Sequence, residues 1–232
     1  MNKVAVLVDG GFFKKRMMTI YGKLSPEDLA SKLLDQCRAH VKKHSEKGNP
    51  GELYRIFYYD CLPLSKKVAH PLTGEIIDFS KKDSTIEALA FLDILRQKRK
   101  VALRLGKLSG NGSKYILPSY NVKKLCDGSL TKDNIKYGDL KLDVKQKGVD
   151  MRIGLDIASL SYKHQVDQII LIAGDSDFVP AAKLARREGI DFILDPMWNQ
   201  IAPDLMEHID GLYSTCEKPK ALKKKGSDTK KN

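Results

Sequence analysis

Short runs of apolar residues alternate along the chain with longer segments in which apolar positions recur every three or four residues. The runs are rich in β-branched and aromatic side chains, which is typical of buried strands. They predict strands over residues 3–9, 52–60, 101–108, 140–144, 167–173 and 190–194. The periodic segments predict helices over residues 12–21, 25–44, 83–99, 149–164, 178–188 and 200–208. Strands that alternate with helices indicate an α/β fold with a mainly parallel sheet.

Local signals indicate where several helices begin and end. Ser25 is a good N-cap before Pro26, and Asp177 is a candidate cap for the helix that ends at Gly189. The helix over residues 149–164 has apolar residues around most of its circumference. We therefore expect that helix to be buried.

Three segments lack these patterns. Residues 62–82 predict a loop. Residues 109–139 are rich in Gly, Ser, Asn and Lys, and they predict an insertion that forms a hairpin or a loop over the site. The Lys-rich residues 217–232 predict a disordered tail. We therefore expect one domain over residues 1–216 that carries this insertion.

Positive charge is in excess over the whole chain. Lys and Arg number 41 against 29 Asp and Glu, which gives a net charge of +12. The tail holds seven Lys and two acids, so the body is basic as well. This balance suggests a polyanionic partner such as a nucleic acid. The alternative is a soluble basic protein with a solvated tail.

Apolar length and cysteine spacing exclude several other classes. No apolar run approaches the roughly 20 residues of a membrane helix, so we expect no membrane partner. The first apolar run closes at Asp9 without a cleavage site, which argues against a signal peptide. The four cysteines form no C-x-x-C pair, so zinc-ribbon and thioredoxin-like sites lose support. We expect reduced thiols in a cytoplasmic protein.

Carboxylates follow three of the predicted strands, as Asp9, Asp60 and Asp175. A fourth acid, Asp150, stands at the start of a predicted helix. Because sites in open α/β sheets form beyond the carboxyl ends of the strands, we expect these acids to meet at one edge. Clustered carboxylates need a compensating cation, and their oxygens suit Mg²⁺ or Mn²⁺. An acidic centre within a basic protein suits metal-dependent cleavage of a nucleic acid.

Each of these acids also has a structural alternative. The acids at the strand ends could simply form turns. Asp150 and Asp177 could cap helices. Asp156 could form an ion pair with Arg152 one helical turn away.

One ordered set of motifs carries a family resemblance. The set runs through Val8-Asp9-Gly10-Gly11-Phe12, Phe57-Tyr58-Tyr59-Asp60, Lys147-Gly148-Val149-Asp150, Asp156, Gly174-Asp175-Ser176-Asp177-Phe178-Val179-Pro180 and Gly189. It spans roughly residues 3–214 and resembles the NYN-domain family, a branch of the PIN-like nucleases. The resemblance implies a PIN-like three-layer α/β/α sandwich.

The resemblance also implies an activity, which is metal-dependent hydrolysis of RNA with Mg²⁺ or Mn²⁺ as cofactor. It gives catalytic and metal-binding roles to Asp9, Asp150, Asp175 and Asp177, with Asp156 as a further metal ligand. Lys147 and Ser176 would contact the substrate. RNA is the implied partner, and a second copy of the chain or a regulatory protein stays open as an additional one.

A departure from the family pattern favours a second hypothesis. Many relatives place Asn shortly after the first Asp-Gly, where this chain has Gly11-Phe12-Phe13. The chain would then be a non-catalytic RNA-binding or regulatory module. A toprim-like DNA enzyme is a weaker alternative, because it expects Glu where this chain has Asp9. His40 and His44 are spaced as in some metal sites, but their charged surroundings predict a solvated helix face.

Overall fold

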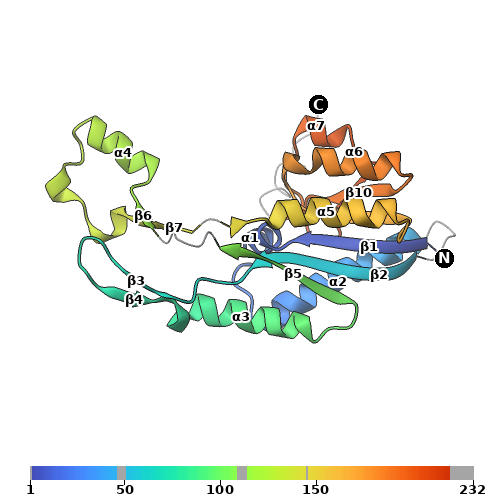
Figure 1. Ribbon diagram of the computed structural model, residues 1–232, viewed down its shortest axis with the longest axis horizontal. Helices are drawn as coiled ribbons and strands as arrows, with labels where there is room; N and C mark the ends of the chain where they lie inside the picture. The colour runs from blue at the N-terminus through green and yellow to red at the C-terminus, as the bar shows by residue number, and fades with distance from the viewer. Residues whose placement is uncertain (1, 46–50, 109–113, 145, 220–232) are drawn as a thin grey trace, which may run out of the picture. The chain divides into compact units, whose positions relative to one another are not determined.

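The computed structural model describes residues 2–45, 51–108, 114–144 and 146–219 (Figure 1). Its main sheet has the strand order β11-β10-β9-β1-β2-β5-β8. The strands are β1 (Asn2–Asp9), β2 (Gly51–Cys61), β5 (Val101–Leu108), β8 (Gln146–Lys147), β9 (Gln168–Ile172), β10 (Asp191–Asp195) and β11 (Gly211–Leu212). Strand β1 pairs in parallel with β2 and β9, and β10 pairs in parallel with β9 and β11. The predicted mainly parallel α/β fold is therefore confirmed.

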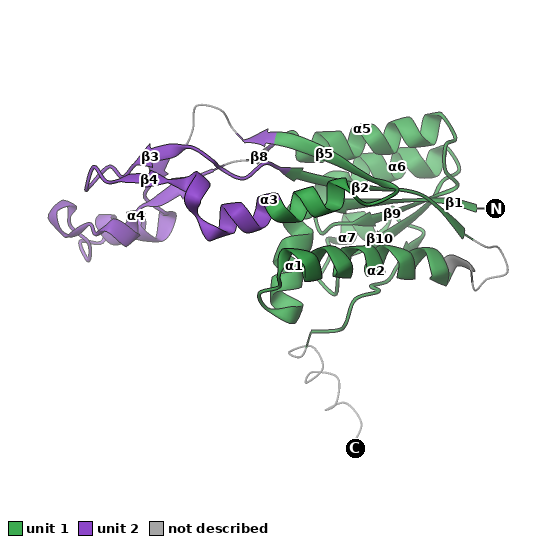
Figure 2. Ribbon diagram, turned by 90° about the horizontal axis from the view of Figure 1, so that it is seen from below, with its two compact units in different colours: residues 1–60, 90–106, 148–232 green, residues 61–89, 107–147 purple. Residues whose placement is uncertain are grey.

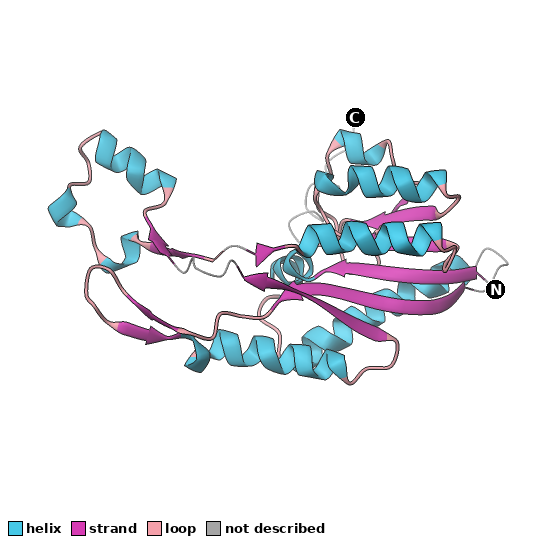
Figure 3. Cartoon of the chain, viewed as in Figure 1, coloured by secondary structure: helices cyan, strands magenta, loops and turns pink. Residues whose placement is uncertain are grey.

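Helices cover both faces of this sheet, which makes three layers (Figure 3). On one face, alternate residues of β1 pack against helices α1 (Gly10–Tyr21) and α2 (Pro26–Ser45) and the C-terminal half of α3 (Asp83–Arg96). On the other face, α5 (Val149–Tyr162) contacts β1, and α6 (Val179–Arg187) contacts β10. This arrangement is the α/β/α sandwich of the PIN-like fold.

The chain divides into two compact units (Figure 2). The first contains residues 1–60, 90–106 and 148–232, and the second contains residues 61–89 and 107–147. The described residues of the second unit include two antiparallel pairs of short strands and a short α-helix, besides the first part of α3. These elements are β3 (Lys67–Ala69), β4 (Ile76–Asp78), β6 (Lys114–Ile116), β7 (Lys141–Asp143) and α4 (Ser119–Cys126). Aromatic rings hold this unit together, since His70 stacks on Tyr137 with 3.9 Å between the ring centroids.

The predictions for this second unit are partly wrong. Residues 62–82 are not only a loop, because β3 and β4 form a hairpin there. The predicted insertion over residues 109–139 contains α4, which the sequence pattern did not indicate, and its residues 109–113 lie outside the described part. Strands of three residues are too short to show a period-two pattern. The helix is missed because most of its residues are exposed and polar.

Helix α5 is less buried than predicted. Ile153 and Ile157 are fully buried against the sheet. Met151, Leu155 and Tyr162 are instead 72%, 63% and 61% exposed. The sheet and α6 cover only part of the helix surface, so apolar residues remain on a face that the first unit leaves uncovered.

His40 lies in the core, so the prediction of a solvated face for it is wrong. Its side chain is 0% exposed, and its Nε2 lies 2.7 Å from Oδ2 of the buried Asp195. Leu33 and Cys37 precede it at helical spacing and are also fully buried, which marks this side of α2 as the inner one. The side chain of His44 lies outside the described residues.

Two further expectations concern the ends and the cysteines. Residues 220–232 of the predicted tail lie outside the described residues. In the described part, no helix combines the length and the apolar character that crossing a bilayer would require. All four cysteines, which the structure describes, are free thiols, and Cys37 and Cys61 are buried.

Candidate active site

The carboxyl ends of the central strands place several acids at one edge of the sheet. Asp9 ends β1 and is level with Tyr59 of β2. Its neighbour Val8 is level with Ile172 of β9, three residues before Asp175. The parallel register therefore brings the ends of β1, β2 and β9 to the same edge, as the sequence predicted.

Asp9 joins β1 to α1 and is half-buried. Its Oδ1 accepts a hydrogen bond of 3.1 Å from the backbone N–H of Phe12, which caps the helix. Burial raises the pKa of Asp9, and the negative charges of Asp150 and Asp60 raise it further, against the lowering effect of backbone hydrogen bonds. The negative charges of two other carboxylates therefore act on Asp9.

A glycine follows Asp9 because the chain is crowded there. A Cβ on Gly10 would lie 2.5 Å from the hydroxyl oxygen of Tyr58 and 2.6 Å from the carbonyl oxygen of Tyr59. Both distances are shorter than real Cβ contacts, so only glycine fits. The Asp-Gly pair lets α1 begin directly against the end of β2.

Asp60 is a buried acid at this edge, with an exposed fraction of 2%. Its Oδ2 lies 2.6 Å from Nζ of Lys14 on α1 and accepts a 3.1 Å hydrogen bond from the hydroxyl of Tyr58. Burial and the charge of Asp60 raise the pKa of Tyr58, so this hydroxyl remains a donor. Lys14 therefore brings a positive charge to the acidic edge.

Asp150 lies in the first turn of α5 after Gly148, which has a φ of +78°. Its side chain is exposed on one side and bordered by protein on the other. This partial burial raises its pKa, and the charges of Asp175 and Asp177 raise it further. Asp150 therefore interacts electrostatically with Asp9 on one side and with the acids that follow β9 on the other.

Asp175 and Asp177 occupy the turn that leads from β9 into α6. Asp175 caps a short 3-10 helix by accepting a 3.1 Å hydrogen bond from the backbone N–H of Asp177. The predicted capping role of Asp177 is wrong, because α6 begins after Phe178 without a side-chain cap. The side chain of Asp177 is exposed beside Asp150.

Phe12 fills the space next to this turn. A Cβ on Gly174 would lie 2.4 Å from Cε2 of Phe12, so the aromatic ring rests directly on the glycine backbone. The residue that departs from the family pattern thus packs at the acidic edge.

Asp156 has partners of its own. Its Oδ2 accepts hydrogen bonds from the hydroxyl of Tyr59 at 2.8 Å and from Nε of Arg104 at 3.0 Å. Burial and the charge of Asp156 raise the pKa of Tyr59, which keeps this donor protonated. Two side chains of the sheet therefore hold the carboxylate of Asp156 in place. Asp156 lies six residues after Asp150 in α5, which is more than one helical turn.

The two predicted substrate contacts lie in different units. Ser176 begins the 3-10 helix of the acidic turn, between Asp175 and Asp177. Lys147 belongs to the second unit, where it pairs across the strands with Lys107. Like charges opposite each other are unfavourable, so an anion would stabilise this exposed pair.

The acidic residues suit a hard cation but do not form a closed metal site. Among the described residues, no three His, Cys, Asp or Glu side chains are close enough together to hold a metal ion. The donors are all carboxylate oxygens, which Mg²⁺ and Mn²⁺ prefer. Burial, and after it the charges of neighbouring acids, raise the pKa values of Asp9 and Asp150, and a bound cation would favour their ionised forms. The chemistry of the donor set therefore fits a divalent ion.

One residue of this edge has a weak signal in the sequence, and another has none. Asp60 appeared to be a turn residue, although its position directly after an apolar strand is the signal that it shares with Asp9. Lys14 gave no signal, because a lysine in an amphipathic helix is usually solvated. Only the packing of α1 across the end of β2 brings these two residues together.

Comparisons with known proteins add a family match. The family model described as NYN domain matches residues 75–214. This range includes Asp150, Asp156, Asp175 and Asp177, while Asp9 lies outside it. A comparison with curated proteins found no match.

One solved structure resembles the whole chain weakly. It is the crystal structure of a protein of unknown function from Vibrio parahaemolyticus RIMD 2210633. The two are 16% identical, the alignment covers 93% of this chain and 94% of the other, and the TM-score is 0.47. A likeness at this level supports no inference about the site.

Proposed function

We propose, because this chain belongs to the NYN domain family of PIN-like nucleases, that it is a metal-dependent ribonuclease which hydrolyses RNA phosphodiester bonds. The catalytic residues in this proposal are Asp9, Asp150, Asp175 and Asp177. The observation that carries it is the register of the parallel strands, which brings Asp9 and the turn with Asp175 and Asp177 to one edge of the sheet, with Asp150 beside Asp177.

PIN-like nucleases typically use divalent metals, and Mg²⁺ or Mn²⁺ is the proposed cofactor. Such an ion, when bound, would activate water and stabilise charge on the scissile phosphate, which would leave a 5′-phosphate and a 3′-hydroxyl. The chain's own residues prepare the site. The backbone N–H of Phe12 orients the carboxylate of Asp9. The ammonium group of Lys14 balances the charge of Asp60 and so reduces the negative charge at this edge.

The positive charge of the chain supports RNA as the substrate. The net charge of +12 attracts a phosphate backbone, while the acids repel it unless a cation intervenes. We include Ser176 as a substrate contact in the acidic turn, and Lys147 as a phosphate contact. The free cysteines fit a reducing compartment, so we place the reaction in the cytoplasm.

Cleavage assays with matched variants test this proposal. Labelled single-stranded and structured RNA would be incubated with the full chain in Mn²⁺, Mg²⁺ or EDTA. We expect cleavage with a metal only, and a loss of about 100-fold or more in Asp9→Asn and Asp150→Asn. Asp35→Asn, which removes an exposed acid on α2, is the control that should keep full activity. Full activity in Asp150→Asn would contradict the proposal.

A second function has one observation in its favour. The ring of Phe12 rests on Gly174 at the position where relatives carry a polar residue. A non-catalytic RNA-binding module would bind RNA equally well in Mn²⁺ and in EDTA and would show no turnover in either. The cleavage assay therefore separates the two functions when binding is measured on the same samples.

A further inference from the structure

The outer surface of α6 connects the acidic edge to a group of basic side chains. We call this surface the α6 track and define it by Pro180, Lys183, Leu184 and Arg187 on α6 and by Tyr162 on α5. Three neighbouring hollows of the first unit lie along it. Each hollow shares lining residues with the next, so the three follow one another along α6.

The first hollow starts at the acidic edge. Asp150 and Asp177 line it together with apolar residues of α5 and α6, which include Met151, Pro180 and Leu184. Met151 is 72% exposed and belongs to the uncovered face of α5. Apolar side chains therefore line this end of the path beside the carboxylates.

The second hollow continues along the same helix. It shares Pro180 and Leu184 with the first and adds Tyr162, Lys183 and Arg187. Tyr162 is 61% exposed, so its ring is available for stacking. An exposed aromatic ring between cationic side chains is typical of surfaces that bind single-stranded nucleic acids.

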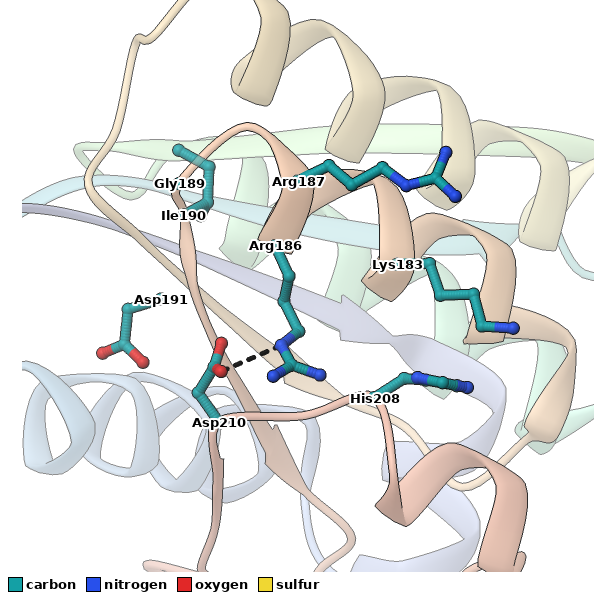
Figure 4. A pocket seen from close by; sticks show the side chains of 8 residues that line it. All are labelled: Lys183, Arg186, Arg187, Gly189, Ile190, Asp191, His208 and Asp210. Carbon is teal, nitrogen blue, oxygen red and sulfur yellow. Dashed lines mark ion pairs between the residues drawn. The ribbon is translucent and has the colours of Figure 1, made fainter.

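The third hollow ends the path with positive charge (Figure 4). It shares Lys183 and Arg187 with the second and adds His208. Among the described residues, neither Lys183 nor Arg187 has an ion-pair partner. Figure 4 shows Arg186 turned to Asp210 instead, with 2.9 Å between Nε and Oδ1.

Five acids also line the three hollows, and two of them are engaged by other side chains. Asp210 is paired with Arg186, and Asp191 accepts a hydrogen bond from Gln168. Glu188 lines the second hollow and is partly buried. Lys183 and Arg187 are therefore the two lining cations at this end that are left to bind an anion, because Arg186 is paired with Asp210.

From this arrangement we propose that the α6 track holds a single strand of RNA, with bases stacked on Tyr162 and phosphates bound by Lys183 and Arg187. This inference rests on the proposed function, because it supplies the path by which a strand reaches the acids. Helix α6 has nine residues and is about 13 Å long. A stacked strand rises about 3.4 Å per nucleotide, so the track accommodates about four nucleotides.

A second copy of this chain is a poorer occupant. A twofold interface places the same patch of both subunits in contact. Such an interface would bring Lys183 and Arg187 of both copies into one buried patch, and like charges in an interface are unfavourable. A polyanion complements the same surface without this cost.

Binding measured in EDTA tests the track without requiring cleavage. The probe is a fluorescently labelled 12-nucleotide single-stranded RNA, titrated with the full chain between 50 and 200 mM salt. We expect the double variant Lys183→Ala/Arg187→Ala to lower the slope of log affinity against log salt by about 1.4, which corresponds to two lost phosphate contacts. The matched control is Lys98→Ala/Arg99→Ala, which removes two exposed cations at the turn after α3 and should keep the slope.

Tyr162 is tested by two substitutions. We expect Tyr162→Ala to weaken binding about fivefold or more, because a stacking platform is lost. Tyr162→Phe keeps the ring and should bind as the unchanged protein does. Thermal unfolding of each variant checks that these exposed changes leave the fold intact.

The outcomes separate this proposal from the nuclease proposal. Weaker binding in the track variants with no cleavage by any protein would support the track and contradict the nuclease. Cleavage by the unchanged protein with equal affinities for the track and control variants would overturn the track alone. A track variant that changes the sedimentation coefficient but not RNA affinity would overturn it in favour of self-association.

Discussion

At the scale of single residues, the ionised carboxylates at the acidic edge lie in an unfavourable environment. The pKa of Asp150 is raised by partial burial and by Asp175 and Asp177. A raised pKa means that the folded state binds the proton more tightly than the unfolded state. The ionised form therefore destabilises the fold. This effect is absent below the unfolded value of 3.8, grows as pH rises through the folded pKa, and is constant above it.

We therefore predict that Asp150→Asn raises the melting temperature at pH 7, while it removes activity. The increase should be no more than about 2 °C, because solvent screens this exposed group. At pH 3 the variant and the unchanged protein should melt at nearly the same temperature. Scanning fluorimetry at both pH values checks this, and a lower melting temperature of the variant at pH 7 would contradict it.

Crowding at Gly174 leads to a second prediction at this scale. Its Cβ would collide with Cε2 of Phe12 at 2.4 Å, so we expect Gly174→Ala to destabilise the protein by about 1–3 kcal/mol. The double variant Gly174→Ala/Phe12→Leu should recover part of this loss, because a smaller side chain leaves room for the methyl group. Urea unfolding of both variants gives the comparison, and additive losses would show that the contact is not responsible.

At the scale of elements, the end of β10 is tied to α2 by a buried polar group. Asp195 accepts hydrogen bonds of 2.7 Å from Nε2 of Gln36 and from the N–H of Met197, and it lies 2.7 Å from His40. Burial alone would raise its pKa, but the contacts with His40, Met197 and Gln36 outweigh burial and lower it. A lowered pKa stabilises the fold above the unfolded value of 3.8 and loses this effect as pH falls through the folded pKa.

We predict that Asp195→Ala costs about 3–5 kcal/mol of unfolding free energy at pH 7, because it leaves buried polar partners without their acceptor. The difference from the unchanged protein should shrink as pH falls below 3.8. Urea unfolding at pH 7 and pH 3 measures it. Asp35→Ala on the exposed side of α2 is the control, and an equal loss in that variant would contradict a special role for Asp195.

The same scale explains what the sequence could and could not predict. Strands β1, β2 and β9 were predictable because buried parallel strands are continuous apolar runs, and the acids after them followed from the strand-end rule. His40 looked solvated because its sequence neighbours are charged, although Leu33 and Cys37 mark its side of α2 as buried. The role of Lys14 depends on a contact between α1 and β2, which no local pattern encodes.

At the scale of the whole molecule, two of the groups of cations can be separated by experiment. One is the α6 track of the first unit. The other is the end of the chain, where residues 220–232 contain six Lys and one Asp. Each lysine that neutralises a phosphate contributes about 0.7 to the salt slope of binding to a single strand.

We predict that deletion of residues 220–232 lowers the salt slope and leaves the rate at saturating RNA unchanged, because the acids that we propose as catalytic remain. KM should rise, since uniform binding of substrate and transition state is lost. Combined with Lys183→Ala/Arg187→Ala, the deletion should give slope changes that add, because separate phosphate contacts release separate counterions. Salt titrations and steady-state kinetics on the four proteins test this. A fall in kcat with an unchanged KM would instead place the end of the chain in the catalytic step.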